Sequence, residues 1–510
     1  MTVTAMTETE RKYEVEETTQ VPDLGGLGRS TVEKPVTLRA VYFDTAEGAL
    51  AARLVTLRRR TGGTDAGWHL KTPGTDGRTE HRLPLGASDT APPDELVCLV
   101  RALVRDRPLG EVARVTTRRT VVNLLDAEGS PVVEIADDQV SATDIRTGIL
   151  RIWREWEAEL LDAAPSASGK RAKLLDAVEK VLLVAGATPA RSASKLAQAT
   201  GRSSLAPEHR LARSKFTRSS TSLEVVVAVV DQLTGSLLEA DPRARADEDD
   251  AVHHLRTIVR RLRALLAAVE GVLAPDATDP VRSGLRRFGT ILGGARDTQV
   301  RRDRAISLLA ETEDEASAEN TDLRRRLVDD ALVEYEARHA ELLEYLDSAE
   351  YFALLDELDA LAVRPPVAEA SHERARPQLR SVLKKQTRRA LRRLRKAAKD
   401  GDIEALHHGR KATRQLRYAA EAFSGESAPV LGRKTRDLAS AAGSVQNVIG
   451  DHRDALLFIE RLDEVSREAI AAGEDVAGYG ILAEAEGRNA AAALREVDKA
   501  IDALAAAARA

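Results

Sequence analysis

Hydrophobic and polar residues alternate along the chain as far as about Thr200, which is the period of a strand with one buried face. Turn signals such as TGGTDAG, PGTDG and DAEGSP separate the alternating segments. The expected strands are Thr7–Glu17, Val36–Asp44, Arg53–Thr61, Gly67–Thr72, Arg78–Leu85, Val112–Asp126, Pro131–Asp138 and Leu150–Leu161. Helices are expected at Pro92–Arg105 and Lys170–Ala185. Eight such strands suit an antiparallel sheet that closes into a tunnel or barrel with flanking helices.

A helical period replaces the alternation after Leu205 and continues to the C-terminus, where an alanine-rich stretch predicts a closing helix. Breaks are expected at APDATDP, RPP and GESAP. The segment SSLAPEHRLARSKFTRSS, which lies between the two patterns, is predicted to be a linker. We therefore expect an α+β multidomain protein with a β domain at 6–200, a linker at 201–217 and an all-α domain at 218–510.

Two segments of the helical half resemble each other. VHHLRTIVRRLR at Val252–Arg263 aligns with LHHGRKATRQLR at Leu406–Arg417. The aligned side chains are His253, Arg256, Arg260 and Arg263 in the first copy and His407, Arg410, Arg414 and Arg417 in the second. Their offsets place each set of four within about 80° on a helix, so each copy presents one basic face.

A second match follows each copy, because ILGGARD at Ile291–Asp297 resembles VIGDHRD at Val448–Asp454. Two matches in the same order indicate an internal duplication. Two helical bundles related by a pseudo-two-fold axis would bring the two basic faces near one another.

A lone arginine stripe is usually a solvated face that pairs with nearby acids. The segment Leu383–Lys399 departs from that pattern, because it carries nine lysines and arginines and no acid. Like charges four residues apart destabilise a helix, and an external polyanion would remove that cost. The adjacent histidines of each copy diverge on a helix, so we expect structural or anion-binding histidines in preference to metal ligands.

The strand half carries charges where a core face would be apolar. Glu8, Glu10 and Lys12 share one face of the first strand, and Glu155, Glu157 and Glu159 share one face of the last. Apolar Val55, Leu57, Trp156 and Leu160 lie on the opposite face, where helices can cover them. Carboxylates suit hard divalent cations, and arginines and lysines suit phosphate oxygens. A charged lumen of this kind predicts a site for a metal-chelated phosphate chain.

Composition and charge limit the ligands and the cellular location that we expect. The net charge is −5, so any basic site must be local, and the chain has a single cysteine, Cys98. No apolar run approaches the roughly 20 residues that a membrane span needs, and the N-terminus lacks an apolar signal core. We expect a cytoplasmic protein without a membrane partner. Aromatic residues make up 3% of the chain and do not accompany the basic faces, which argues against nucleic acid as a ligand.

The helical half resembles the CHAD family from about Arg218 to the C-terminus, through VHHLR…RRLR, LGGARD, LHHGRKATRQLRYAAE and QNVIGDHRD. Mild departures from the family pattern are Gly409 and Ile449. The resemblance implies two pseudo-symmetric four-helix bundles that bind inorganic polyphosphate. The implied ligands are the eight aligned residues and Lys411, and we add Lys384, Arg388 and Arg392 from the basic segment.

The strand half resembles the CYTH family of triphosphate tunnel metalloenzymes over roughly Met6–Ala199. Its E-x-E-x-K signature stands as ETERK, and YFDT, LRRRTGG, GWHLK, RTEHRLP, VEIADDQV, WREWEAEL and SASKL follow in family order. The resemblance implies metal-side residues Glu8, Glu10, Glu157 and Glu159, phosphate-holding residues Lys12, Arg58, Arg60, Lys71, Arg82, Arg119 and Lys195, and metal-binding or organising residues Glu80, Glu134, Asp138 and Glu155. Whether Arg118 or Arg119 faces the lumen stays open, because neighbouring residues alternate.

These resemblances predict a metal-dependent triphosphatase. We expect the tunnel to hydrolyse inorganic tripolyphosphate with Mg²⁺ or Mn²⁺, and the helical half to bind polyphosphate and to associate the enzyme with polyphosphate granules. The same lumen would also suit an adenylate cyclase or a thiamine triphosphatase. A third alternative is a non-catalytic polyphosphate-binding or scaffold protein.

Overall fold

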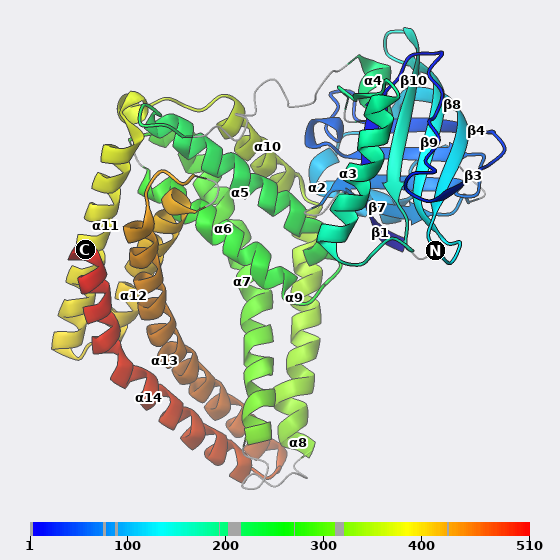
Figure 1. Cartoon of the computed structure of the whole chain (residues 1–510). Coiled ribbons are helices and arrows are strands. Elements are labelled where there is room, and N and C mark those ends of the chain that lie inside the picture. Colours follow the sequence, from blue (N-terminus) through cyan, green and yellow to red (C-terminus); the bar gives the residue numbers. More distant parts are fainter. Residues whose placement is uncertain are drawn as a thin grey trace. The chain divides into compact units, whose positions relative to one another are not determined.

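The computed structural model describes residues 4–74, 78–86, 90–192, 194–201, 216–269, 271–311, 321–425 and 428–509. The chain divides into two compact units, Met1–Glu208 and His209–Ala510 (Figure 1). Most of the predicted linker, residues 202–215, lies outside the described residues.

The N-terminal unit is built around one antiparallel sheet. Its strands are β1 (Thr4–Glu8), β2 (Glu10–Glu14), β3 (Arg29–Val32), β4 (Val36–Asp44), β5 (Thr56–Thr61), β6 (Gly67–Pro73), β7 (Arg78–Leu83), β8 (Gly110–Leu125), β9 (Pro131–Asp144), β10 (Leu150–Leu160) and β11 (Thr188–Pro189). The strand order is β1-β7-β6-β5-β4-β8-β9-β10-β2-β11, and β3 pairs with β8.

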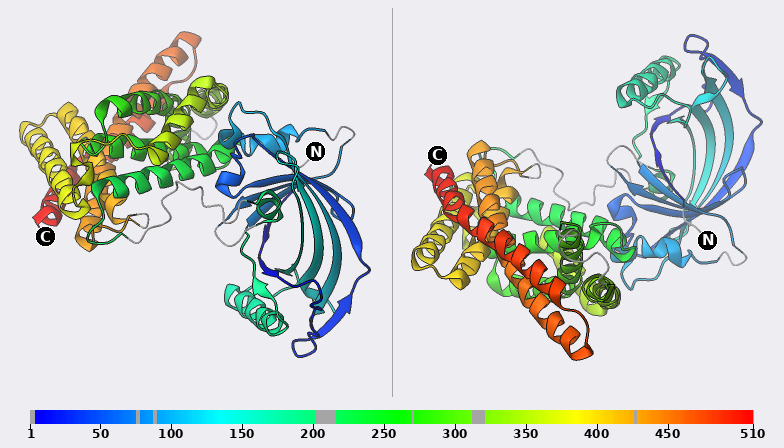
Figure 2. Two further views of the ribbon diagram at one scale, coloured as in Figure 1. Left: turned by 90° about the horizontal axis from the view of Figure 1, so that it is seen from above. Right: turned by 90° about the horizontal axis from the view of Figure 1, so that it is seen from below.

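The sheet curves strongly, as Figure 2 shows, although its hydrogen-bonded order has two ends and is not closed. Only Thr9 separates β1, which pairs with β7, from β2, which pairs with β10. The first stretch of chain therefore joins both flanks of the sheet. The antiparallel prediction is confirmed, whereas the count of eight strands is wrong for the described residues. The first strand is split, and β3 and β11 are too short to show alternation.

Helices cover the outer face of the sheet, as expected. The side chains of Leu57, Trp68 and Leu70 point outward and pack against α1 (Asp94–Cys98) and α2 (Arg101–Val104). Trp156 and Leu160 pack against α3 (Ser168–Val184) in a second cluster. Because both apolar faces point outward, the charged faces of the same strands line the lumen.

A short helix, α4 (Lys195–Thr200), packs on the inner face. Its Leu196 and Ala199 join an apolar cluster with Ala40 and Tyr42. Those two residues face Arg60 and Arg58 across the β4–β5 pair, and directly opposed residues point to the same side of a sheet. α4 therefore fills part of the lumen and brings Lys195 into it.

The C-terminal unit is all-helical in the described residues. Its helices are α5 (Ser222–Arg245), α6 (Ala251–Ala268), α7 (Pro275–Glu311), α8 (Thr321–Arg324), α9 (Asp330–Leu346), α10 (Ala349–Val363), α11 (Ala375–Asp400), α12 (Ile403–Ser424), α13 (Arg433–Ala472) and α14 (Ala477–Arg509). A capping box formed by Thr221 and Glu224 begins α5. Helix boundaries fall at all three predicted breaks.

These helices form two groups. α11, α12, α13 and α14 pack in sequence, and α5, α6, α7, α9 and α10 pack together in the first half. The two basic segments lie on α6 and α12, which contact each other, so the prediction that they come close is confirmed. None of the helices in the described residues is both long and apolar enough to cross a membrane.

Candidate functional site

The strand register gathers the predicted carboxylates on one inner wall. Across the β2–β10 pair Glu10 faces Glu159 and Lys12 faces Glu157. Across the β9–β10 pair Glu159 faces Glu134, and Glu155 faces Asp138, the residue that also opposes Arg119 on β8. Residues that lie far apart in the sequence are therefore neighbours in the lumen.

Glu157 is the centre of this wall. Its carboxylate contacts the ammonium of Lys12, lies 2.8 Å from Lys195 Nζ and accepts a 2.7 Å hydrogen bond from Arg119 Nη2. Arg119 also donates two 2.7 Å bonds to Asp138, the forked geometry that favours arginine. Burial opposes the charge of Glu157, yet Lys12, Lys195 and Arg119 hold its pKa well below the ordinary value.

Glu80 organises the facing wall. It is fully buried and contacts the guanidinium of Arg82, with Lys71 Nζ at 3.5 Å and Arg58 Nη2 at 3.7 Å. His69 Nδ1 lies 3.1 Å from the same carboxylate. One carboxylate therefore fixes three of the predicted phosphate-holding side chains.

Arg58 has a second partner on this wall, and Arg60 completes it. Arg58 donates a 3.5 Å bond to the hydroxyl of buried Tyr42, and Arg60 pairs with Asp65. Burial, together with Arg58 and Arg119, lowers the pKa of Arg60 to about 9. Cations that crowd one another in this way would be stabilised by an anion between them.

A compact group of oxygen ligands fits a divalent cation. Asp138, Glu155 and Glu157 each offer one oxygen, and these atoms lie within 4.8 Å of one another. Hard cations such as Mg²⁺ and Mn²⁺ prefer such carboxylate sets. Glu10 lies one strand away; burial opposes its charge, but Lys12 and Lys71 together lower its pKa, so it too is charged.

The remaining predicted tunnel residues are placed less tightly. Glu134 Oε1 lies 3.8 Å from Arg119, and burial raises the pKa of Glu134. Glu159 is half-buried beside Glu10. The side chain of Glu8 lies outside the described part of the chain. Arg118 is exposed, so Arg119 is the member of that pair that faces the lumen.

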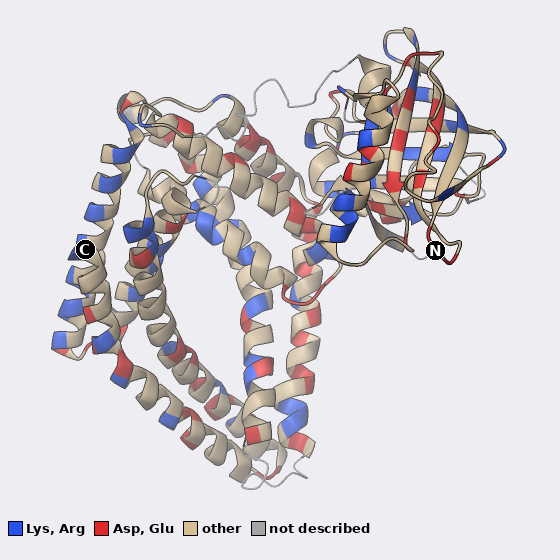
Figure 3. Cartoon of the chain, viewed as in Figure 1, with Lys and Arg blue, Asp and Glu red and all other residues tan. Residues whose placement is uncertain are grey.

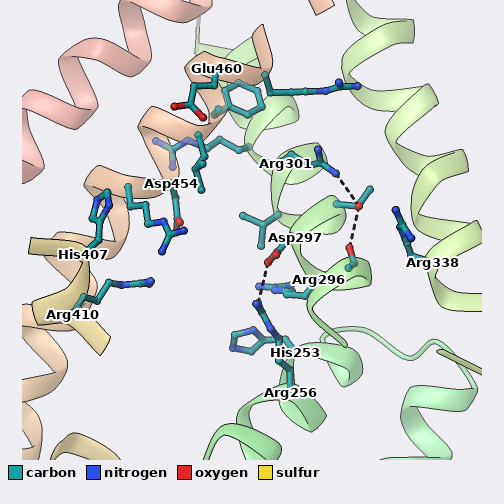
Figure 4. Close-up of a pocket in the computed structure, with 18 of the residues that line it drawn as sticks. His253, Arg256, Arg296, Asp297, Arg301, Arg338, His407, Arg410, Asp454 and Glu460 are labelled. Atoms are coloured by element: carbon teal, nitrogen blue, oxygen red, sulfur yellow. Dashed lines mark hydrogen bonds and ion pairs between the residues drawn. The ribbon is translucent and has the colours of Figure 1, made fainter. Parts of the chain in front are cut away.

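A cavity of about 900 Å³ opens between the helices that carry the two basic segments. His253, Arg256 and Arg260 line it from α6, and His407, Arg410, Lys411 and Arg414 line it from α12. Figure 4 shows His253 and Arg256 on one side and His407 and Arg410 on the other. In all, eleven lysines and arginines line the cavity, against five aspartates and glutamates.

The electrostatics of this cavity favour an anion. Burial, with Arg260, Arg410 and Arg263 nearby, lowers the pKa of Arg414 to about 10. His253 Nδ1 and His407 Nε2 are buried and find no hydrogen-bond partner among the described residues. Ring nitrogens without partners in a basic cavity are available to phosphate oxygens.

Five predicted polyphosphate ligands lie elsewhere. Arg263 lines an adjoining cavity of about 220 Å³, and Arg417 forms a 2.7 Å ion pair with Glu421. Lys384, Arg388 and Arg392 are exposed on α11 and line neither cavity. Figure 3 shows lysines and arginines along the length of α11, which makes it a separate basic surface.

Other residues belong to the sites but were not among the predicted ligands. In the cavity these are Arg296, Arg301, Arg304, Arg338, Arg453 and Arg461, and in the tunnel they are Tyr42, Asp65 and His69. The second repeated motif contains Arg296 and Arg453, so the duplication was a usable signal for that pair.

Family models and relatives match both halves of the chain. The CYTH domain model matches residues 6–199, and the CHAD domain model matches residues 228–463. Two proteins of Mycobacterium tuberculosis, MT2285 from strain CDC 1551 / Oshkosh and Rv2226 from strain ATCC 25618 / H37Rv, are each 37% identical over 525 residues. Each alignment covers 97% of this chain and 97% of the relative.

Solved structures resemble parts of the chain. PptA from Streptomyces chartreusis is 20% identical with a TM-score of 0.45, and the match covers 55% of this chain and 99% of PptA. The CHAD domain from the plant Ricinus communis is 23% identical with a TM-score of 0.40, covering 59% of this chain and 96% of that domain. HpAC1 from Hippeastrum, reported to have a dominant triphosphatase activity, is 18% identical with a TM-score of 0.22, covering 40% of this chain and 99% of HpAC1.

Proposed function

Because the chain belongs to the CYTH and CHAD families, we propose that its tunnel hydrolyses inorganic tripolyphosphate with Mg²⁺ or Mn²⁺ and that its helical half binds long-chain polyphosphate. One observation carries the catalytic part of the proposal. Of the predicted tunnel residues with described side chains, seven are cations and seven are carboxylates, and the strand register, together with α4 for Lys195, directs them toward one lumen. A metal-chelated triphosphate presents the complementary set of charges.

Both walls of the lumen would contact the phosphates, and one of them would also bind the cation. Arg58, Lys71 and Arg82, aligned by Glu80, would hold the phosphate oxygens on one side. Arg119, Lys12 and Lys195 would hold them on the other, beside the carboxylates that would bind the cation. The divalent cation, when bound, supplies charge neutralisation and orients a water for attack. No side-chain nucleophile is needed for this chemistry.

The basic cavity supports the second part of the proposal. Its excess of guanidiniums and its unpartnered histidine nitrogens suit a flexible chain of phosphates. A polyphosphate bound there would hold the enzyme at its polymer, in the cytoplasm and at polyphosphate granules. The exposed face of α11 would add a weaker, solvent-screened attraction.

One substrate panel tests the catalytic proposal. Phosphate release is measured with tripolyphosphate, ATP and thiamine triphosphate, each with Mg²⁺, with Mn²⁺ and with EDTA. We expect metal-dependent release that is fastest with tripolyphosphate. Release of pyrophosphate from ATP together with a cyclic nucleotide would assign a cyclase, and preference for thiamine triphosphate would assign that rival. Turnover of none of the three would leave a scaffold protein.

A further inference from the structure

A cation of the protein itself occupies the tightest group of carboxylates in the tunnel. Lys195 Nζ lies 2.9 Å from Asp138 Oδ2, 2.5 Å from Glu155 Oε1 and 2.8 Å from Glu157 Oε1. These are the three residues whose oxygens converge within 4.8 Å of one another. The ammonium therefore stands at the point where those oxygens would meet a metal ion.

The fold holds this ammonium in place. Lys195 is the first residue of α4, and Ser194 caps that helix by accepting a bond from the Ala197 N–H. The next residue, Leu196, anchors α4 in the apolar cluster of the lumen. Lys195 is only 9% exposed, so solvent cannot easily replace it. The packing of α4, in addition to electrostatic attraction to the carboxylates, therefore sets the position of the Lys195 ammonium.

Trp153 orients Glu155 toward the ammonium. The Oε2 of Glu155 accepts a 2.6 Å bond from Trp153 Nε1, which orients the carboxylate. Its Oε1 is buried and forms the 2.5 Å ion pair with Lys195. A divalent cation in place of the ammonium would take the same oxygen as a ligand, without the directional demand of an N–H donor.

From this geometry we infer that Asp138, Glu155 and Glu157 form a divalent-cation site that Lys195 fills in the metal-free tunnel, and that metal binding displaces its ammonium. The single positive charge of the ammonium leaves and the two positive charges of the cation arrive, so the carboxylates become better neutralised. The displaced ammonium then lies in the lumen as an additional donor for a phosphate. That last step rests on the proposed function, whereas the competition between lysine and metal does not.

The competition has a reciprocal consequence. If metal and ammonium exclude each other at the three carboxylates, a ligand that draws Lys195 away must tighten metal binding by the same factor that metal tightens the ligand. Lys12 is a weaker competitor, because among the described residues it forms an ion pair with Glu157 but with neither of the other two carboxylates.

The test measures Mn²⁺ binding to the full chain without substrate, by the electron paramagnetic resonance signal of free Mn²⁺. Lys195→Gln should bind Mn²⁺ about tenfold more tightly than the unmodified chain, since a unit positive charge has left the immediate surroundings of the ion. Lys195→Arg should not tighten binding, because the charge remains. Lys180→Gln, an exposed lysine on α3, is the matched control and should leave the affinity unchanged. Asp138→Asn added to Lys195→Gln should abolish the gain.

A second measurement on the unmodified chain guards against misfolded variants. Reductive methylation of Lys195, followed by mass spectrometry, should rise several-fold as Mn²⁺ is added, while labelling of Lys180 stays constant. Mn²⁺ affinity that is unchanged or weaker in a folded Lys195→Gln variant, or labelling that does not respond at saturating Mn²⁺, would overturn the inference. Neither readout depends on hydrolysis, so loss of the exchange and loss of the triphosphatase activity are separate results.

Discussion

The tunnel and the helical cavity both gather arginines and lysines, yet they manage charge in opposite ways. In the tunnel most cations pair with buried carboxylates, Arg60 being the exception, and these carboxylates outweigh burial to raise the pKa of Lys12 and Lys195. In the cavity burial comes first and neighbouring arginines add to it, so the pKa of Arg260, Arg410 and Arg414 falls. A site whose cations are already paired with carboxylates needs a metal to attract a polyanion. A site whose cations repel one another attracts a polyanion directly.

The largest effect should follow loss of the carboxylate at the centre of the tunnel. Glu157→Gln should reduce metal-dependent tripolyphosphate hydrolysis by about a hundredfold or more, since it removes a charge from the metal side and from three cations. Initial rates at limiting Mg²⁺ measure this. Glu128→Gln in the exposed β8–β9 turn is the matched control. Full activity in a folded Glu157→Gln variant would remove the tunnel from the mechanism.

A smaller effect should follow loss of one phosphate donor. Arg58→Ala or Arg60→Ala deletes charge-assisted hydrogen bonds worth about 1.5–3 kcal/mol, which corresponds to roughly a tenfold to hundredfold loss of kcat/KM. Lysine at either position should restore activity only in part, because a point charge does not reproduce the guanidinium fork. Complete rescue by lysine would mean that charge alone matters at this wall.

The helical cavity should respond without any metal. Arg256→Ala with Arg260→Ala, or Arg410→Ala with Arg414→Ala, should weaken polyphosphate binding by about tenfold at low salt, and the four changes together should cost more. Binding by the unmodified chain should fall steeply with salt, as counterion release requires. Arg388→Ala with Arg392→Ala on α11 is the comparison pair, and its effect should be smaller because those side chains are exposed. A larger loss from the α11 pair would move the main binding surface out of the cavity.

The smallest effect concerns pH. Burial and nearby arginines lower the pKa of His253 and His407, so both rings are mainly neutral near pH 7 in the free protein. Bound phosphates favour the protonated rings, so affinity for polyphosphate should rise about threefold from pH 8 to pH 6. Titrations at constant ionic strength measure this change. His253→Gln with His407→Gln should flatten the profile, and an unchanged slope would place the titrating groups elsewhere.

Strand alternation predicted most of the tunnel because a period of two fixes which side chains share a face. It could not choose between Arg118 and Arg119, since that choice depends on register, and pairing of Arg119 with Asp138 decides it. The helical repeat predicted His253, Arg256 and their counterparts in the cavity. It could not reveal Arg338, because α9 brings that residue to the cavity through packing that leaves no repeat in the sequence.

The proposed function assigns this chain both a metal-dependent phosphate site, in its β unit, and a metal-independent one, in its helical unit. The most direct test measures tripolyphosphate hydrolysis and long-chain polyphosphate binding on the same sample before and after EDTA. We predict that EDTA abolishes hydrolysis, that Mg²⁺ or Mn²⁺ restores it, and that polyphosphate affinity stays within about twofold throughout. Hydrolysis that persists in EDTA, or polyphosphate binding that disappears with the metal, would contradict this account.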